Sequence, residues 1–267
     1  MAIDGKWNKP QINRQNADLL GKAVHLAYKE PETIKNELQK WDMQLVHFFD
    51  RQHTQAYLAK NDQTCILSFR GTQPNKIRDW LYDLDSRFVN APKGMVGRVH
   101  VGFLNALNAV WPEVWMTLQK ERGARSLWIT GHSLGGALAV LATARLRFSK
   151  AQPINGLYTF GQPRVGDLEF CTCFNQGFGK STFRFVNYHD IVPRVPLRNM
   201  GYEHQGEFFF FNVNKYDPDM TWDKVLLSKV GNSIREIVDT NDISDHYMDN
   251  YLSKLKTLAD YTGWHDL

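Results

Sequence analysis

The residues Gly131-His132-Ser133-Leu134-Gly135 decide the fold class of this chain, because they join a predicted strand to a predicted helix. The apolar run at 126–130 predicts a short buried strand, and the run at 134–148, rich in Ala and Leu, predicts a helix. Glycines two positions before and two positions after the serine remove β-carbons that would clash in such a tight turn. We therefore expect Ser133 at the amino end of a helix, where free N–H groups favour a developing oxyanion.

Outward from this stretch, strands and helices alternate along the chain. Helices are expected at 16–28, after Pro31, at 102–119, at 221–239 and at 247–258. Strands are expected at 45–49, 55–59, 64–69, 157–160, 183–186 and 207–213. Turns rich in Asp and Asn separate the first three strands and predict a meander, and Pro112 should kink or break its helix. The alternation favours an α/β fold with a central, mostly parallel sheet flanked by helices.

Length and composition are those of one globular domain over residues 1–267. The chain has a mass of 30.9 kDa, and its 43% apolar and 22% charged residues allow a sizeable core and exclude a disordered chain. The sequence contains no internal repeat, no low-complexity block and no Pro/Gly/Ser linker that could separate two domains. Aromatic residues make up 13% of the chain, which is high for a mean hydropathy of -0.44 and suggests an apolar ligand.

Several classes of function receive no support from the sequence. The net charge of +4 is mild and its basic residues are scattered, so nucleic-acid binding is not expected. Three cysteines argue against a disulfide framework, and Cys171 and Cys173 have no second pair with which to form a zinc site. No metal cluster, nucleotide loop or cofactor is expected, although a structural calcium stays open. No apolar run of about 18 residues offers a transmembrane segment.

The first residues of the chain give no sign of a targeting signal. The segment Met1-Ala2-Ile3-Asp4-Gly5-Lys6 lacks an apolar stretch after its charges, so no signal peptide is visible. Cytoplasmic localisation and secretion without a signal peptide both stay open, as does the oligomeric state.

A serine nucleophile needs a general base and a third group that orients the base, in the chain order Ser, then Asp or Glu, then His. The histidines downstream of Ser133 are His189, His204, His246 and His265. Spacing favours His246, which lies in a polar loop just before the last predicted helix, whereas His204 fits a packing or surface role better. Asp190 falls just after a predicted strand, at the carboxyl edge where α/β sites are built.

The sequence resembles the fungal-type triacylglycerol lipases, which form the class 3 lipase family of α/β-hydrolases. The resemblance covers residues 57–252, and it rests on several ordered motifs. These are Phe69-Arg70-Gly71-Thr72, Val99-His100-Val101-Gly102-Phe103, residues 131–137, residues 159–166, residues 187–196 and Asp245-His246. Several motifs in the same order are far more specific than one pentapeptide.

The resemblance implies a catalytic mechanism for the chain. The family's catalytic acid falls on Asp190 and its histidine on His246, in agreement with the choices made from spacing. The implied reaction is attack by Ser133, proton transfer through His246 and support of the imidazolium by Asp190. An acyl-enzyme would form and would then be hydrolysed by water, and no cofactor is required.

The resemblance also implies an oxyanion hole. Its donors in the family are the backbone N–H of the residue after the nucleophile and a Ser or Thr that follows the Phe-Arg-Gly strand. These positions are Leu134 and Thr72, and Thr72 would contribute its N–H with its hydroxyl as a further donor. Each donor of this kind is worth about 3–4 kcal/mol of transition-state stabilisation.

The lid segment, residues 73–84, follows Thr72. Ile77, Trp80 and Leu81 lie at helical spacing and give a short apolar stripe, which is typical of a surface helix packed on a core. The family places a mobile lid helix over the active site here, and its pattern Arg78-x-Trp80-x-x-Asp83-Leu84 is present. In the family, the position of Asp83 helps to hold the oxyanion residue. Extra residues before Ile77, including a proline, leave the extent of lid motion open.

The expected function is hydrolysis of acylglycerol esters, a triacylglycerol lipase activity with a lipid ester substrate at an oil–water or membrane interface. Phospholipase A1 and feruloyl-type esterase activities stay open because fold and triad do not fix the substrate. A non-catalytic binding protein is disfavoured by the complete set of Ser133, Asp190 and His246. The helix expected at 221–239, with Trp222, is a second candidate apolar surface, although core packing explains it better.

Overall fold

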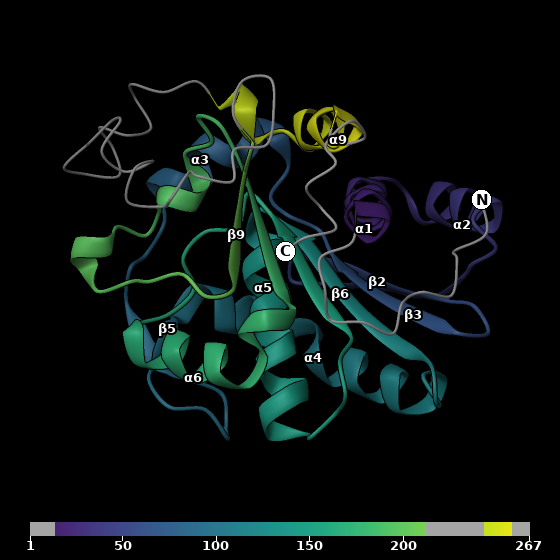
Figure 1. Cartoon of the computed structure of the whole chain (residues 1–267), viewed down its shortest axis with the longest axis horizontal. Helices are drawn as coiled ribbons and strands as arrows, with labels where there is room; N and C mark the ends of the chain where they lie inside the picture. The colour runs from purple at the N-terminus through teal and green to yellow at the C-terminus, as the bar shows by residue number, and fades with distance from the viewer. Residues whose placement is uncertain (1–13, 212–242, 258–267) are drawn as a thin grey trace.

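A seven-stranded sheet forms the centre of the computed structural model, which describes residues 14–211 and 243–257 (Figure 1). Its strands follow the order β1-β2-β3-β6-β7-β8-β9. They are β1 (Gln44–Arg51), β2 (Thr54–Lys60), β3 (Thr64–Phe69), β6 (Ser126–His132), β7 (Gly156–Phe160), β8 (Thr182–Asn187) and β9 (Glu207–Phe211).

The sheet combines an antiparallel meander with a parallel part. The strands β1, β2 and β3 pair antiparallel in chain order, which is the meander that the sequence predicts. The turn Gln52-His53 joins the first two strands, and Asn61-Asp62-Gln63 joins the second to the third. From β3 to β9 every neighbouring pair is parallel, because helical crossovers return the chain to the same end of the sheet each time. The carboxyl ends of β3, β6 and β8 therefore meet at one edge, where the loops that follow them can build a site.

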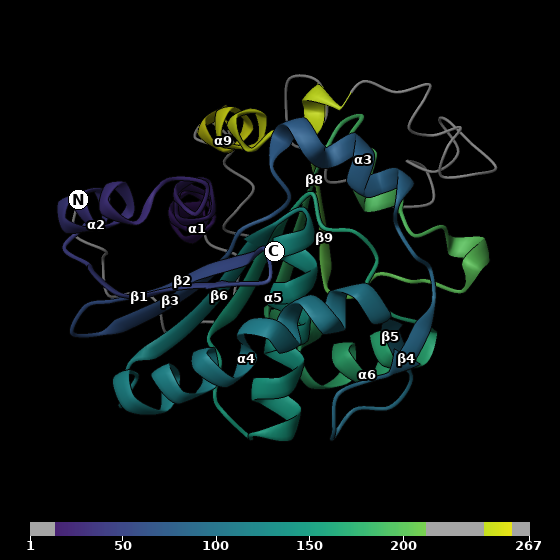
Figure 2. The same ribbon diagram turned by 180° about the vertical axis from the view of Figure 1, so that it is seen from behind.

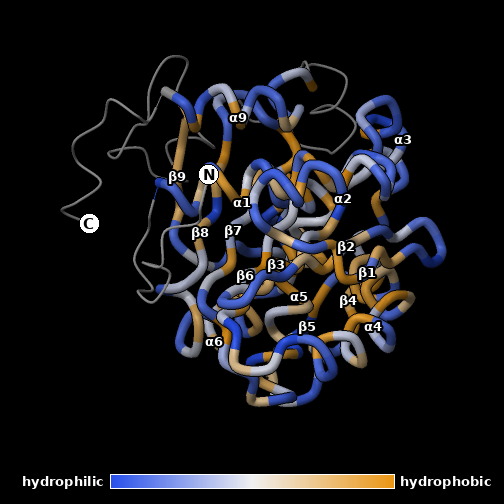
Figure 3. The backbone as a smooth tube through the Cα atoms, turned by 90° about the vertical axis from the view of Figure 1, so that its right-hand side faces the viewer, coloured by the Kyte–Doolittle hydropathy of each residue, from blue (hydrophilic) through white to orange (hydrophobic). Residues whose placement is uncertain are grey.

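Helices cover both faces of the sheet (Figure 2). They are α1 (Arg14–Leu26), α2 (Pro31–Lys40), α3 (Ile77–Tyr82), α4 (Val101–Glu121), α5 (Leu134–Ala144), α6 (Leu168–Phe178) and α9 (Met248–Thr257). The helices α4, α5 and α6 pack on one face and α1, α2 and α9 on the other, each with its own cluster of buried apolar side chains. Trp128 of β6 belongs to the second cluster and is buried there. Figure 3 shows hydrophobic residues gathered along the central strands and hydrophilic ones in the outer turns.

Shorter elements complete the description. They are the hairpin β4 (Phe88–Asn90) and β5 (Arg98–His100), the short helices η1 (Pro74–Lys76), η3 (Gly179–Ser181), η4 (Val192–Arg194), η5 (Arg198–Met200) and η6 (Ser244–His246), and the π-helical turn η2 (Arg145–Ser149). In the described ranges, no helix is both long and apolar enough to span a bilayer.

Three sequence expectations need correction. Pro112 does not break its helix, because α4 runs through it and its buried face, which includes Leu107 and Val114, outweighs the lost hydrogen bond. The helix after Ser133 ends at Ala144 rather than continuing to 148, since the chain widens into the π-helical turn η2. The β4–β5 hairpin was not expected, because its strands are too short to show a pattern.

Two expectations concern segments beyond the described ranges. The strand expected at 207–213 is described to Phe211, and the rest of it lies outside the described residues. The helix expected at 221–239, with Trp222, also lies outside them, as does His265.

Candidate active site

The turn between β6 and α5 has the tight geometry that its glycines predict. Ser133 has φ 57° and ψ -131°, a conformation that L-residues adopt only under strain of about 1–3 kcal/mol. A Cβ at Gly131 would lie 2.1 Å from the carbonyl oxygen of Gly135, and one at Gly135 would lie 2.3 Å from that of Phe69. Only glycine fits at both positions, so the backbone of β3 and of α5 can approach Ser133 closely.

A buried carboxylate–imidazole pair lies at the carboxyl end of β8. Asp190, three residues beyond that strand, places its Oδ1 and Oδ2 at 2.9 and 2.8 Å from Nδ1 of His246 on η6. A carboxylate only accepts hydrogen bonds, so Nδ1 carries the proton and Nε2 is left as the acceptor. Two further donors hold the carboxylate, namely the Tyr251 hydroxyl at 2.6 Å and the Val192 amide at 2.9 Å.

Ser133 and His246 each keep one buried polar atom without a hydrogen-bond partner. Both side chains are 0% exposed. Within the described ranges, Ser133 Oγ and His246 Nε2 have no hydrogen bond, although leaving such an atom unsatisfied costs about 1–3 kcal/mol. In a structure without substrate, hydrogen bonds between a nucleophile and its base are often long or poorly aligned. The two unsatisfied atoms are the ones that a serine–histidine proton transfer would join.

Gly161 adjoins the carboxylate–imidazole pair, and the sequence had not singled it out. Its φ is +56°, and a Cβ there would lie 2.7 Å from Asp190 Oδ2 and 2.8 Å from Nδ1 and Cε1 of His246. The backbone at Gly161 is thus one wall of the pair, which no larger residue could form. The glycine stands inside the 159–166 motif, and its position after β7 was the only signal available.

The expected oxyanion donors lie on two sides of Ser133. Leu134 is the first residue of α5, and Thr72 follows β3 by three residues. A Cβ at Gly71 would lie 2.8 Å from Ser133 Cβ, so this loop runs directly against the serine. In residues 14–211 and 243–257, neither the Thr72 nor the Leu134 amide donates to a backbone acceptor, which leaves both free for an oxyanion.

The lid segment lies against the loop that follows Asp190. Ile77 and Leu81 are buried, and with Trp80 they pack in one apolar cluster. The partners across the cluster are Ile191, Val192, Val195 and Leu197. Trp80 also stacks on Phe103 of α4, with ring centroids 6.3 Å apart. Asp83 is exposed, and among the described residues no hydrogen bond links it to Thr72, so its expected holding role is not seen in this arrangement.

Of the other candidate histidines, the structure describes His189 and His204. His189 precedes Asp190, and its side chain is 41% exposed, with Nδ1 3.9 Å from Asp245. His204 is half-buried, and its Nε2 donates to the carbonyl oxygen of Pro193 at 2.8 Å, which agrees with the packing or surface role expected from sequence. Burial is the main cause that lowers the pKa of His204 well below its ordinary value.

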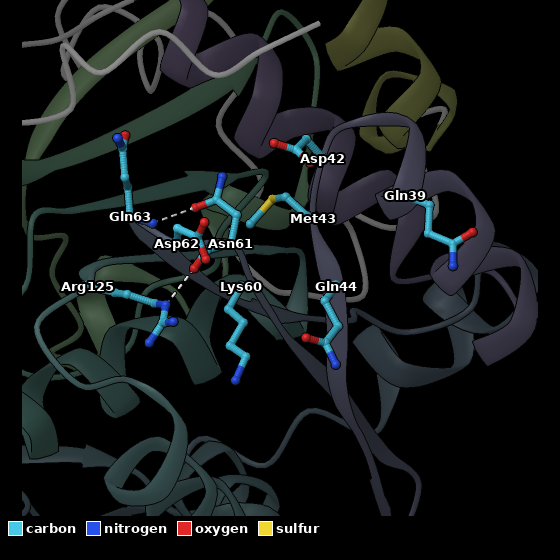
Figure 4. Close-up of a pocket in the computed structure, with 9 residues that line it drawn as sticks. All are labelled: Gln39, Asp42, Met43, Gln44, Lys60, Asn61, Asp62, Gln63 and Arg125. Atoms are coloured by element: carbon cyan, nitrogen blue, oxygen red, sulfur yellow. Dashed lines mark hydrogen bonds between the residues drawn. The ribbon is translucent and has the colours of Figure 1, made fainter.

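Two grooves lie at opposite ends of the strands. One of about 550 Å³ adjoins the lid segment, and its lining includes Tyr28, Arg70 and His132. The other, of about 710 Å³, is lined by residues that include Gln39, Asn61 and Arg125 (Figure 4). Asn61 and Arg125 precede β3 and β6, whereas Ser133 follows β6, so a strand length separates this second groove from the serine.

The part of the chain that the structure describes contains no cluster of three or more His, Cys, Asp or Glu side chains that could hold a metal ion. Cys65, Cys171 and Cys173 are free thiols.

A serine on a strained strand–helix turn and an Asp–His pair at the carboxyl edge of a mostly parallel sheet define the α/β-hydrolase class. The family Lipase (class 3) matches residues 66–200. The chain belongs to that family.

Individual relatives agree with this assignment. The triacylglycerol lipase OBL1 of Arabidopsis thaliana is 29% identical over 255 residues, which cover 73% of this chain and 49% of the plant protein. A lipase of Rhizomucor miehei is 35% identical over 170 residues, which cover 60% of this chain and 46% of the fungal protein. The chain thus spans about half the length of the curated relatives it matches.

Solved structures of lipases share the fold. The lipase from Rhizopus microsporus var. chinensis superposes with a TM-score of 0.71 at 25% identity, covering 88% of this chain and 86% of the fungal one. A triacylglycerol lipase whose catalytic centre is formed by a serine protease triad superposes with a TM-score of 0.67 at 25% identity, covering 87% and 91% of the two chains.

Proposed function

We propose that this chain, as one α/β-hydrolase domain over residues 1–267, hydrolyses carboxylic esters of acylglycerols. The observation that carries the proposal is the buried Asp190–His246 pair, whose free Nε2 shares the site with the unsatisfied Oγ of Ser133. A buried acceptor and a buried hydroxyl are unfavourable in a purely structural core, and they are the groups that nucleophilic catalysis requires.

Each residue of the proposed triad has one task. Ser133 Oγ attacks the ester carbonyl carbon while His246 Nε2 takes its proton, and the imidazolium gives that proton to the leaving alcohol oxygen. Asp190 remains ionised, holds Nδ1–H and stabilises the imidazolium. Water then attacks the acyl carbon while His246 removes one of its protons. The imidazolium returns that proton to Ser133 Oγ as the bond to the acyl group breaks, and the carboxylic acid leaves.

In this proposal, two backbone amides stabilise the oxyanion by hydrogen bonds. The N–H groups of Leu134 and Thr72 donate to the carbonyl oxygen as it becomes negative, and the amino end of α5 adds its dipole. Each donor contributes about 3–4 kcal/mol to the transition state. The Thr72 hydroxyl is a third donor within this proposal.

The apolar side of the lid segment supports a lipid substrate. Ile77, Trp80 and Leu81 form an apolar stripe that is buried against the site in this structure. We propose that the stripe turns outward at an oil–water or membrane interface, exposes Ser133 and contacts the acyl chains. The names of the relatives, triacylglycerol lipase and lipase, support the same substrate class.

A substrate series tests the proposal and separates it from phospholipase A1 and feruloyl-type esterase activity. The full chain is assayed on p-nitrophenyl esters of increasing chain length, on a triglyceride emulsion, on phospholipid vesicles and on a feruloyl ester, with Ser133→Ala as the control. We expect release of fatty acid from triglyceride, with a loss on the order of 10⁶-fold in kcat for Ser133→Ala. A variant that retains activity would overturn the enzyme assignment, and preference for phospholipid or the feruloyl ester would overturn the substrate assignment.

A further inference from the structure

The residue before the proposed nucleophile, His132, has no part in the mechanism above, yet it lies against the proposed base. Its side chain is 2% exposed. Its ring stacks on the ring of His246, with centroids 4.5 Å apart and planes inclined by 29°. Two imidazoles this close repel each other when both are charged, so the protonation state of His132 directly affects His246.

Two hydrogen bonds fix the tautomer of His132. Its Nε2 lies 2.6 Å from the backbone carbonyl oxygen of His246, and because a carbonyl only accepts, Nε2 carries the proton. Nδ1 is therefore the acceptor, and the Tyr28 hydroxyl donates to it at 2.7 Å. The Tyr28 hydroxyl also lies against the backbone of Gly71, since a Cβ at Gly71 would lie 2.5 Å from the hydroxyl oxygen. Every polar atom of the His132 ring is thus engaged in the neutral form.

The surroundings of His132 keep the ring neutral. Burial is the largest cause that lowers its pKa well below the ordinary value, and His246 and His25 lower it further. The third ring near it, that of Tyr251, lies edge-on with centroids 5.9 Å apart. His132 therefore does not compete with His246 for the serine proton.

The backbone of His246 needs an anchor of this kind. His246 is the last residue of η6, a helix of only three residues (Ser244–His246), and its own amide donates to Ile243. The hydrogen bonds to Asp190 hold the Nδ1 side of the imidazole ring. The direction in which Nε2 points therefore depends on where the backbone of His246 lies. His132 holds that backbone through the carbonyl and covers one face of the ring.

We propose that His132 is a positioning residue for the base, and that Tyr28 sets its tautomer; this inference rests on the proposed function. Two hydrogen bonds join Tyr28 through His132 to the backbone of His246, and Tyr28 also packs against Gly71 in the loop that carries Thr72. Tyr28 and His132 thus connect the oxyanion loop with the backbone that positions the imidazole.

Three variants of the full chain test the network on a soluble p-nitrophenyl ester. His132→Leu removes the donor to the His246 carbonyl, and we expect kcat to fall by about tenfold or more with little change in KM. His132→Gln places an amide N–H where Nε2 was, and it should recover most of that loss. Tyr28→Phe removes only the hydroxyl, so an intermediate loss in kcat is expected.

His204 offers a control. It is a half-buried histidine whose Nε2 also donates to a backbone carbonyl, that of Pro193. His204→Leu should destabilise the fold, while kcat per folded molecule stays at the wild-type level. Unfolding curves measured on the same samples supply the folded fraction.

Two readouts go beyond a structural role. The first is recovery of kcat in His132→Gln, because a purely structural loss of the buried ring would not depend on a donor to the His246 carbonyl. Histidine nitrogen NMR of the wild type should show His132 protonated on Nε2, and Tyr28→Phe should shift the ring toward a mixture of tautomers.

The outcomes separate the two proposals. If the wild type hydrolyses the ester but His132→Leu keeps its kcat, the positioning role is overturned alone. The positioning role is also overturned if His204→Leu loses as much kcat as His132→Leu, or if His132 is protonated on Nδ1. A wild type with no more activity than Ser133→Ala overturns the proposed function, and the inference that rests on it falls too.

Discussion

Replacement of Gly161 by alanine should damage the Asp–His pair from the side of the backbone. The new Cβ would lie 2.7 Å from Asp190 Oδ2 and 2.8 Å from Nδ1 of His246. These distances fall roughly 0.6 Å short of ordinary van der Waals contact, and the packed interior leaves little space for relief. The φ of +56° adds backbone strain of about 1–2 kcal/mol for any residue with a Cβ.

The expected effect on the reaction follows from that displacement. A shift approaching 1 Å in a catalytic group costs about 10²-fold in rate, which corresponds to about 2.7 kcal/mol in the activation barrier. We therefore expect Gly161→Ala to lose about two orders of magnitude in kcat on a soluble p-nitrophenyl ester, with KM nearly unchanged. Urea unfolding should show a loss of about 2–4 kcal/mol in the free energy of unfolding.

Gly123 provides the control, because its backbone is nearly the same and its surroundings are open. Its φ is +55°, and the nearest atom to an added Cβ is Arg125 Nη1 at 3.6 Å. Gly123→Ala should thus carry the backbone strain of about 1–2 kcal/mol without any loss in kcat. A folded Gly161→Ala with wild-type kcat would refute the reasoning, as would an equal loss of kcat in Gly123→Ala.

Three further predictions concern stability, the carboxylate and the lid. Burial lowers the pKa of His100 to about 4, so the unfolded chain binds its proton first and the unfolding free energy should fall by about 3 kcal/mol between pH 6.5 and 4. His100→Asn keeps an acceptor for the first amides of α4, and it should remove this loss of unfolding free energy at low pH, as measured by urea unfolding. If the variant loses the same free energy as the wild type, His100 is not the cause. Tyr251→Phe removes a hydrogen-bond donor to Asp190, and ester kinetics should show kcat lowered about 5- to 10-fold at constant KM. An unaltered kcat would show that catalysis does not need this hydrogen bond. Ile77→Ser should weaken the packing of the closed lid segment by about 1.5–3 kcal/mol. The hydrolysis rate below the aggregation limit of the ester should then rise relative to the rate above that limit. An unchanged ratio of the two rates counts against lid motion.

The elbow and the triad could be predicted because each depends on local chemistry or on chain order. The positions of Gly131 and Gly135 follow from steric exclusion within one turn. The carboxyl-edge rule places Asp190 after a strand, and chain order then points to His246. The apolar spacing of Ile77 and Leu81 likewise predicted an amphipathic helix, and both side chains are buried in the structure.

Other parts of the site depend on contacts between segments that are far apart in the sequence, and no periodic pattern indicates such contacts. Gly161 adjoins Asp190 and His246 only because β7 and β8 are neighbours with a particular register. Tyr251 donates to a carboxylate 61 positions away, and in the sequence it is one more aromatic residue of a terminal helix. The sequence could not predict the exposure of Asp83 either, because it is set by the orientation of the lid segment.

Covalent labelling of the intact chain tests the central claim most directly. A dialkyl p-nitrophenyl phosphate should release p-nitrophenol as it phosphorylates an activated serine, and peptide mass spectrometry identifies the residue. We predict a single adduct on Ser133, slower labelling as the base is protonated at low pH, and no adduct in Ser133→Ala. An adduct on another serine, or an active enzyme whose Ser133 stays unlabelled as hydrolysis stops, would contradict the assignment of Ser133 as the nucleophile.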